Sequence, residues 1–201
     1  MTQALHLLMH GTAIKKHGSS AAIAGIAGLS GAETDANLAS AVALGRILKV
    51  DGKYMLSPAG QMIVGREYSR FWADLRNSEA FRASYERFET INIELKQVIT
   101  AWQTIEVGGK RIANDHSDAA YDEEIIGKLG DLHERFEPIL DQMIKAHARY
   151  GVYKHGLTSA LEKAEDGEVE WVSDATIDSY HTVWFELHED LLRVMGETRD
   201  E

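Results

Sequence analysis

Apolar residues recur every three or four positions along most of this chain, a spacing typical of helices that bury one face. The clearest example runs from Ser78 to Ile105, where one polar residue, Asn92, interrupts the apolar stripe. The pattern predicts a mainly α-helical chain whose later part, residues 76–201, forms an antiparallel helical bundle. After the first stretch, the helices of this bundle are predicted over residues 119–136, 139–150 (started by Pro138), 157–164 and 175–195.

The first 75 residues carry a different pattern, in which a short hairpin follows three helices. Two β-prone runs, residues 48–50 and 54–56, flank an Asp51-Gly52 pair, which is the usual signature of a tight hairpin turn. Ser57 and Pro58 then predict the cap and the first position of a fourth helix. We therefore predict one domain over residues 1–75 and a second over 76–201. The three earlier helices are predicted over residues 3–16, 21–28 and 32–48.

The order of these elements and the run GRILKVDGKYMLSPAGQ resemble the winged helix-turn-helix domain of MarR-like and PadR-like regulators. The resemblance covers roughly Ala4 to Phe71 and implies DNA binding, with the third helix in the major groove. Glu33 and Asp35 at the start of that helix oppose this role, because carboxylates repel phosphates. The candidate phosphate contacts are Lys15, Lys16, Arg46, Lys49 and Lys53, and the candidate base-reading residues are Thr34, Asn37 and Ser40.

Charge is unevenly distributed along the chain, whose net charge is −11. Residues 1–74 hold seven Lys and Arg against five Asp and Glu, whereas the remainder holds fourteen against twenty-seven. Nucleic acid is therefore expected to meet only the first part. The absence of cysteine excludes disulfides, thiolate zinc sites and a cysteine nucleophile. Because no apolar run approaches the ~18 residues of a membrane span, we expect a soluble, cytoplasmic protein.

Aromatic and histidine side chains of the helical part favour a pocket for a small aromatic or hydrophobic ligand. His181 and His188 lie seven residues apart, hence on one helix face, while Asp190 is expected to point largely the other way. A plain aromatic core with histidines at its rim explains the same pattern, so both interpretations stay open. We predict no cofactor and no metal, because Glu-x-x-His pairs on paired helices are missing. The candidate ligand-binding residues are Asn92, Trp102, His133, Tyr180, His181, Trp184 and His188.

A second resemblance extends over more of the chain. The runs NDHSDAAYDEEIIGKL, LHERFEPIL and DSYHTVWFELHEDLL look like a C-terminal extension of some phosphoenolpyruvate-utilising proteins related to pyruvate phosphate dikinase. In those proteins the extension follows a swivelling phosphohistidine domain, which this chain lacks. The resemblance therefore implies a separate subunit that docks to such an enzyme or binds its substrate.

These observations predict first a small-molecule-responsive transcriptional regulator that binds DNA as a homodimer. The alternatives are a non-DNA-binding accessory or substrate-binding subunit of a phosphoenolpyruvate-dependent enzyme, and a metal-dependent helical-bundle enzyme. The chain contains no phosphate-binding P-loop, dinucleotide fingerprint, nucleophile elbow or HExxH motif. We therefore expect no catalytic activity from the chain alone.

Overall fold

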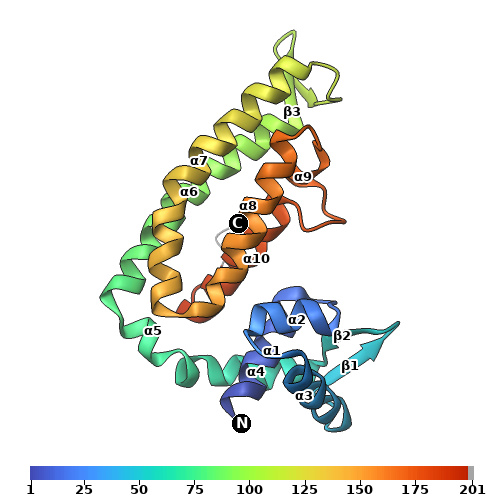
Figure 1. Cartoon of the computed structure of the whole chain (residues 1–201), viewed down its shortest axis with the longest axis vertical. Helices are drawn as coiled ribbons and strands as arrows, with labels where there is room; N and C mark the ends of the chain where they lie inside the picture. Colours follow the sequence, from blue (N-terminus) through green and yellow to red (C-terminus); the bar gives the residue numbers. More distant parts are fainter. Residues whose placement is uncertain (199–201) are drawn as a thin grey trace. The chain divides into compact units, whose positions relative to one another are not determined.

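A computed structural model describes residues 1–198, most of which are helical (Figure 1). This confirms the prediction of a mainly α-helical chain. Two small sheets accompany the helices, each an antiparallel pair of neighbouring strands. Within the described residues, no helix combines the length and apolar character needed to cross a bilayer.

The chain divides into two compact units, and neither is a continuous stretch of sequence. The boundary predicted between residues 75 and 76 therefore differs from this division, because two later stretches return to the first unit. Unit 1 comprises Met1–Glu79, Ala146–Val152 and the described residues from Glu186 onward, and unit 2 comprises Ala80–Lys145 and Tyr153–Phe185.

Unit 1 begins with three helices, a hairpin and two further helices. Four of the helices start at a side-chain cap, because Thr2, Ser19, Ser30 and Ser57 each accept a hydrogen bond from a backbone N–H of the first turn. The first helix packs against the second, third and fourth. The elements are α1 (Gln3–Lys15), α2 (Ser20–Ala27), α3 (Gly31–Ala43), β1 (Ile47–Val50), β2 (Lys53–Leu56), α4 (Pro58–Phe71) and α5 (Ala73–Asn77).

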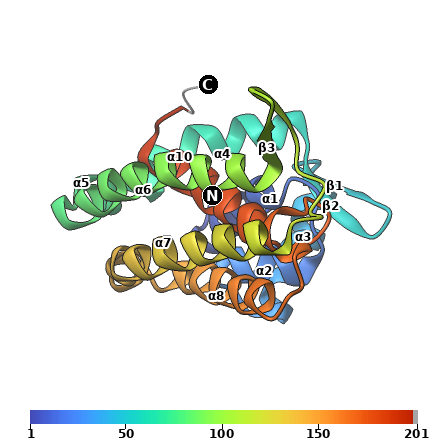
Figure 2. The same ribbon diagram turned by 90° about the horizontal axis from the view of Figure 1, so that it is seen from above.

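The β1–β2 hairpin forms where the Asp51-Gly52 pair predicts a turn, and it projects from the helices in two views (Figures 1 and 2). Both turn residues have positive φ, 49° and 77°, which suits a two-residue hairpin loop. The helix predicted over 32–48 ends earlier, at Ala43. Gly45, with a φ of 67°, ends it because this left-handed conformation turns the chain out of the helix.

Unit 1 is completed by two late segments of the chain, η1 (Ala148–Tyr150) and the second half of α10 (Tyr180–Met195). The carboxylate of Asp190 on α10 accepts two hydrogen bonds from the guanidinium of Arg149, and both side chains are buried. Nε2 of His10 on α1 lies 3.1 Å from Oδ1 of the same carboxylate. The expectation that Asp190 points away from the core is therefore wrong. Asp190 is buried, and so are Arg149 and His10, two side chains that its carboxylate contacts.

Unit 2 is built on two long antiparallel helices joined by a hairpin (Figure 1). The predicted helix break at Pro138 is absent, since a single helix continues through it. Pro138 is exposed, so the carbonyl that loses its partner one turn earlier can bond to water. The elements are α6 (Glu79–Gln103), β3 (Thr104–Val107), β4 (Lys110–Ala113), α7 (Ala119–Ala146), α8 (Gly151–Glu165), α9 (Glu170–Ser173) and the first half of α10.

Gly60 provides a test of the packing between α4 and the chain that leads into β1. A Cβ at this position would lie 2.0 Å from the backbone oxygen of Arg46. We expect Gly60→Ala to lower the free energy of unfolding by about 1–3 kcal/mol, measured by urea denaturation, because the backbone must move apart. Gly65→Ala on the same helix meets nothing within 4 Å and should raise it by about 0.5–1 kcal/mol. Equal effects of the two changes would contradict this packing.

Candidate functional sites

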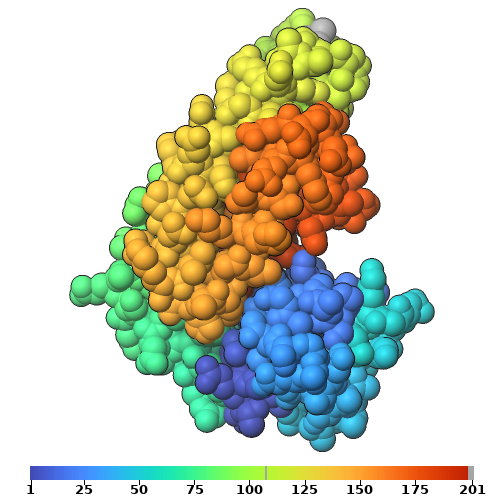
Figure 3. Space-filling view, in the orientation of Figure 1, coloured from blue at the N-terminus to red at the C-terminus, as the bar shows by residue number. Residues whose placement is uncertain are grey.

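The candidate nucleic-acid surface of unit 1 is the β1–β2 hairpin together with the end of α1. Lys49 and Lys53 are exposed, one on each strand, and the Lys49 ammonium lies 5.3 Å from the centre of the Tyr54 ring. Two backbone hydrogen bonds join Gly18 to Tyr54 of the hairpin. They hold the segment that follows Lys16, at the end of α1, beside the hairpin. Figure 3 shows the hairpin standing out from the surface around it. Three of the predicted phosphate contacts therefore lie in one part of unit 1.

Other residues predicted to contact DNA are placed differently. The ammonium of Lys15 lies 2.8 Å from a carboxylate oxygen of Glu186, and both side chains are mostly buried. Thr34, predicted to face outward, is fully buried and cannot reach a base edge. Asn37 is half-buried and donates to the carbonyl of Glu33 at 2.8 Å. Ser40 is exposed, and Arg46 is half-buried.

The exposed side of α3 is acidic rather than basic. Glu33 and Asp35 are both exposed in its first half, and Asp35 accepts a hydrogen bond from Ser20. None of the 13 residues of α3 is Lys or Arg. Phosphate contacts by this unit are therefore expected from the hairpin and the end of α1, not from α3.

Four predicted ligand-binding residues lie together in unit 2. Trp184 Nε1 donates to Asn92 Oδ1 at 3.0 Å, and His133 Nδ1 lies 3.2 Å from the Tyr180 hydroxyl. The rings of Tyr180 and Trp184 stack, and all four side chains are buried. Burial lowers the pKa of His133 and raises the pKa of Tyr180. Because these groups bond to and stack on one another, they form a packed aromatic core rather than an open pocket.

The three other predicted ligand-binding residues lie elsewhere. Trp102 is buried, and its ring packs against that of His116 with 4.5 Å between centres. His181 is half-buried in unit 2, where burial lowers its pKa, whereas His188 is buried in unit 1. The two histidines of α10 therefore belong to different units.

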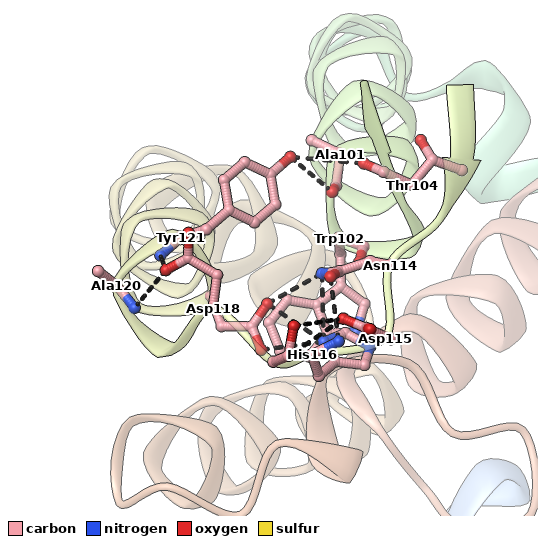
Figure 4. Close-up of polar contacts among 11 residues, drawn as sticks. Ala101, Trp102, Thr104, Asn114, Asp115, His116, Asp118, Ala120 and Tyr121 are labelled. Atoms are coloured by element: carbon pink, nitrogen blue, oxygen red, sulfur yellow. Dashed lines mark hydrogen bonds and ion pairs between the residues drawn. The ribbon is translucent and has the colours of Figure 1, made fainter. Parts of the chain in front are cut away.

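A loop of residues 114–118 closes the end of α6 in unit 2 (Figure 4). The side-chain nitrogen of Asn114 donates to the Trp102 carbonyl and to Asp122 Oδ1, both at 3.0 Å. The Tyr121 hydroxyl donates to the carbonyl of Ala101 at 2.9 Å. These bonds satisfy carbonyls of the last helical turn, which have no helical N–H partner. The run NDHSDAAYD therefore contains the cap of α6.

His116 has the most versatile chemistry in this loop (Figure 4). Its Nδ1 lies 3.1 and 3.0 Å from the two carboxylate oxygens of Asp122, and its φ is 57°. Because a carboxylate only accepts, we assign the proton to Nδ1, which leaves the Nε2 lone pair open on a side chain that is 34% exposed. Such an imidazole can act as a general base or a metal ligand. In the described part of the chain, however, no three His, Asp or Glu side chains gather to hold a metal ion.

Sequence spacing did not reveal the buried charge cluster of unit 1. His10 is held between Asp190 and the hydroxyl of Tyr68, which lies 3.0 Å from Nδ1. Burial lowers the pKa of His10, and Asp190 offsets part of this fall. Burial alone would raise the pKa of Asp190, but the charges of Arg149 and His10 outweigh it and lower that pKa. No local pattern marks these residues, because they come together only through the fold.

His6 lies one helical turn before His10 and is also fully buried. Its ring stacks on that of Phe71 at 4.4 Å, and neither nitrogen has a hydrogen-bond partner among the described residues. Burial, together with the charges of His10 and Arg149, lowers the pKa of His6 to about 3. His6 is therefore neutral in the folded protein at pH 7.

Comparisons of the chain with known proteins gave no relative. No protein-family model matches it, and no curated protein and no solved structure matches it significantly. Proposals about function therefore rest on the geometry of the two units.

The burial of His6 makes a prediction about acid stability. A histidine in the unfolded chain titrates near pH 6.5, whereas the pKa of folded His6 is about 3. Between pH 7 and 5 only the unfolded chain therefore takes up this proton, and the free energy of unfolding falls on acidification. We expect His6→Phe to reduce the loss of the free energy of unfolding between pH 7 and 5 by about 1–2 kcal/mol, measured by urea denaturation. His155→Phe, at an exposed position on α8, is the control and should leave the loss unchanged. The same pH dependence in His6→Phe and the natural protein would refute this account.

The cap of α6 makes a second prediction. Asn114→Ala removes two side-chain hydrogen bonds of 3.0 Å and should lower the free energy of unfolding by about 1–3 kcal/mol. Asn37→Ala is a matched change that removes one hydrogen bond on the exposed side of α3, and its effect should be under about 1 kcal/mol. Thermal or urea unfolding of both variants tests this, and a larger effect at Asn37 would speak against the capping role.

Proposed function

We propose that unit 1 is a winged-helix module that binds DNA, with the β1–β2 hairpin as its wing. The order of three helices, hairpin and helix supports this proposal. The observation that carries it is the exposed pair Lys49 and Lys53 on the hairpin, which stands out from the surface around it (Figure 3). Exposed Lys16 lies two residues before Gly18, which bonds to Tyr54 of the hairpin. Lysines in such positions neutralise phosphates and release bound counterions, which favours association.

In this proposal the module contacts the DNA backbone more than it reads bases. Of the three candidate base-reading residues, only Ser40 is exposed, and the start of α3 presents Glu33 and Asp35. We therefore propose strongly salt-dependent binding with low sequence preference. A regulator of this kind would act as a homodimer, because two hairpins on one duplex double the number of phosphate contacts.

A second function is favoured by apolar side chains on the same hairpin. Leu48 and Met55 are paired across the strands, and together with Val50 they are 36–44% exposed on one face. Leu44, just before the hairpin, is 60% exposed. Contiguous exposed apolar residues suit a protein partner better than a phosphate backbone. The alternative is therefore an accessory subunit that docks through this face to a phosphoenolpyruvate-utilising enzyme.

The two functions differ in the salt dependence of DNA binding. We expect the double variant Lys49→Gln/Lys53→Gln to reduce the slope of log affinity against log salt by about one unit per lost contact, measured by fluorescence anisotropy with a duplex of random sequence. The control Lys96→Gln/Lys110→Gln removes the same charge from unit 2 and should leave the slope unchanged. Absence of binding at ~150 mM salt, or an unchanged slope in the hairpin variant, would reject the wing and favour the docking function.

A further inference from the structure

Unit 1 contains a cleft of about 520 Å³ beside the turn that follows α2. This volume lies within the usual range of small-molecule sites. Gly28 in its wall has a φ of 66°, and a Cβ there would lie 3.2 Å from Cβ of Arg149, so the two segments meet closely only because the residue is glycine. The remaining wall is mostly apolar and consists of Leu7, Ala27, Ala146, His147 and Ala148.

Two buried nitrogens on a pair of rings in contact, one of which lines the cleft, lack hydrogen-bond partners among the described residues. One is Nδ1 of His147, a residue of the cleft wall, although this atom is itself closed to solvent. The other is Nε1 of Trp72, whose ring packs edge-on to that of His147 with 5.5 Å between centres. Trp72 is only 3% exposed. Both atoms are closed to solvent, so a molecule in the cleft meets the other ring nitrogen of His147, Nε2, which is not among the buried unpaired atoms of the described residues.

The charges around the cleft favour an uncharged partner. The guanidinium of Arg149 is engaged by Asp190, so the charge of this wall residue is already neutralised. Ala27 and Ala146 are the last residues of α2 and α7, and helix C-termini carry partial negative charge, which disfavours an anion. No carboxylate is among the lining residues in the described chain, so a cation would enter an apolar site without a counter-charge.

His147 supplies the polar feature that a neutral ligand needs. Burial lowers the pKa of His147, with a further contribution from Arg149, so the imidazole is uncharged at pH 7. A neutral imidazole offers one donor and one acceptor and can therefore bond to a hydroxyl in either direction. The His147 ring lines the cleft and is half-buried, and a ligand there meets its Nε2, because Nδ1 is closed to solvent.

We propose that this cleft binds a small, uncharged, mainly apolar molecule with one hydroxyl or similar group, which bonds to His147. The apolar part of the ligand contacts Leu7, Ala27 and Ala148. The site lies in the same unit as the hairpin and goes beyond the DNA-binding proposal, because it is tested by ligand binding without DNA. It also differs from the aromatic core of unit 2, where sequence reasoning expected such a ligand.

Three bicyclic probes of similar size test this proposal on the full chain. They are 1-naphthol, which has one hydroxyl, naphthalene, which has none, and 1-naphthoate, which is an anion at pH 7. Binding is followed by the indole N–H resonance of Trp72 in a two-dimensional NMR titration, with the signal assigned through Trp72→Phe. We expect saturable binding of 1-naphthol, about tenfold tighter than naphthalene because of the added hydrogen bond, and tighter than 1-naphthoate.

Variants of the cleft separate the polar anchor from the apolar walls. His147→Phe should bring 1-naphthol and naphthalene within about twofold of each other, since the hydrogen bond is gone while the apolar area remains. Ala148→Trp should fill the cleft and abolish binding of both probes, whereas the control His155→Phe should change neither. The proposal is overturned by the absence of a saturable shift with 1-naphthol, by tighter binding of 1-naphthoate, or by a hydroxyl preference that survives His147→Phe.

Discussion

The buried ion pair between Arg149 and Asp190 is the interaction on which unit 1 depends. Both charges are removed from water, which is favourable only when good geometry and extra hydrogen bonds offset the lost hydration. Those conditions are met, because two guanidinium nitrogens bond to both carboxylate oxygens and the hydroxyl of Tyr150 adds a further bond to Arg149. With His10 on the other side of the carboxylate, the pair connects the first helix to two segments that follow much later in sequence.

Local elements of the fold were predictable where a short-range rule decides them. Ser57 caps α4 and Pro58 is its first residue, as the sequence predicts, since both effects depend only on neighbouring backbone groups. The turn at Asp51 and Gly52 follows a similar local rule. Pro138 shows the limit of such rules. Its helix continues through it, with buried Phe136 before it and buried Ile139 after it. The burial of Thr34 and Asp190 depends on distant segments and leaves no local signature.

The candidate sites show the same limit in chemical terms. Spacing placed Asn92 and Trp184 on inward helix faces, and they do meet, but it cannot tell whether a ring faces a ligand or another side chain. In unit 2 these side chains contact each other. In unit 1, His147 lines the cleft and its ring contacts that of Trp72, yet the two residues lie 75 positions apart and share no motif. Only three-dimensional contacts reveal that their nitrogens are unsatisfied.

The discontinuous composition of unit 1 also governs the order in which the protein can fold during synthesis. Ribosomes release the N-terminal helices and hairpin first, yet Asp190 is made more than a hundred residues later. Until then His10 and Arg149 have no carboxylate to face, while unit 2 is complete once Phe185 has emerged. Unit 1, whose first residues are made first, is thus the last of the two units to reach its native packing.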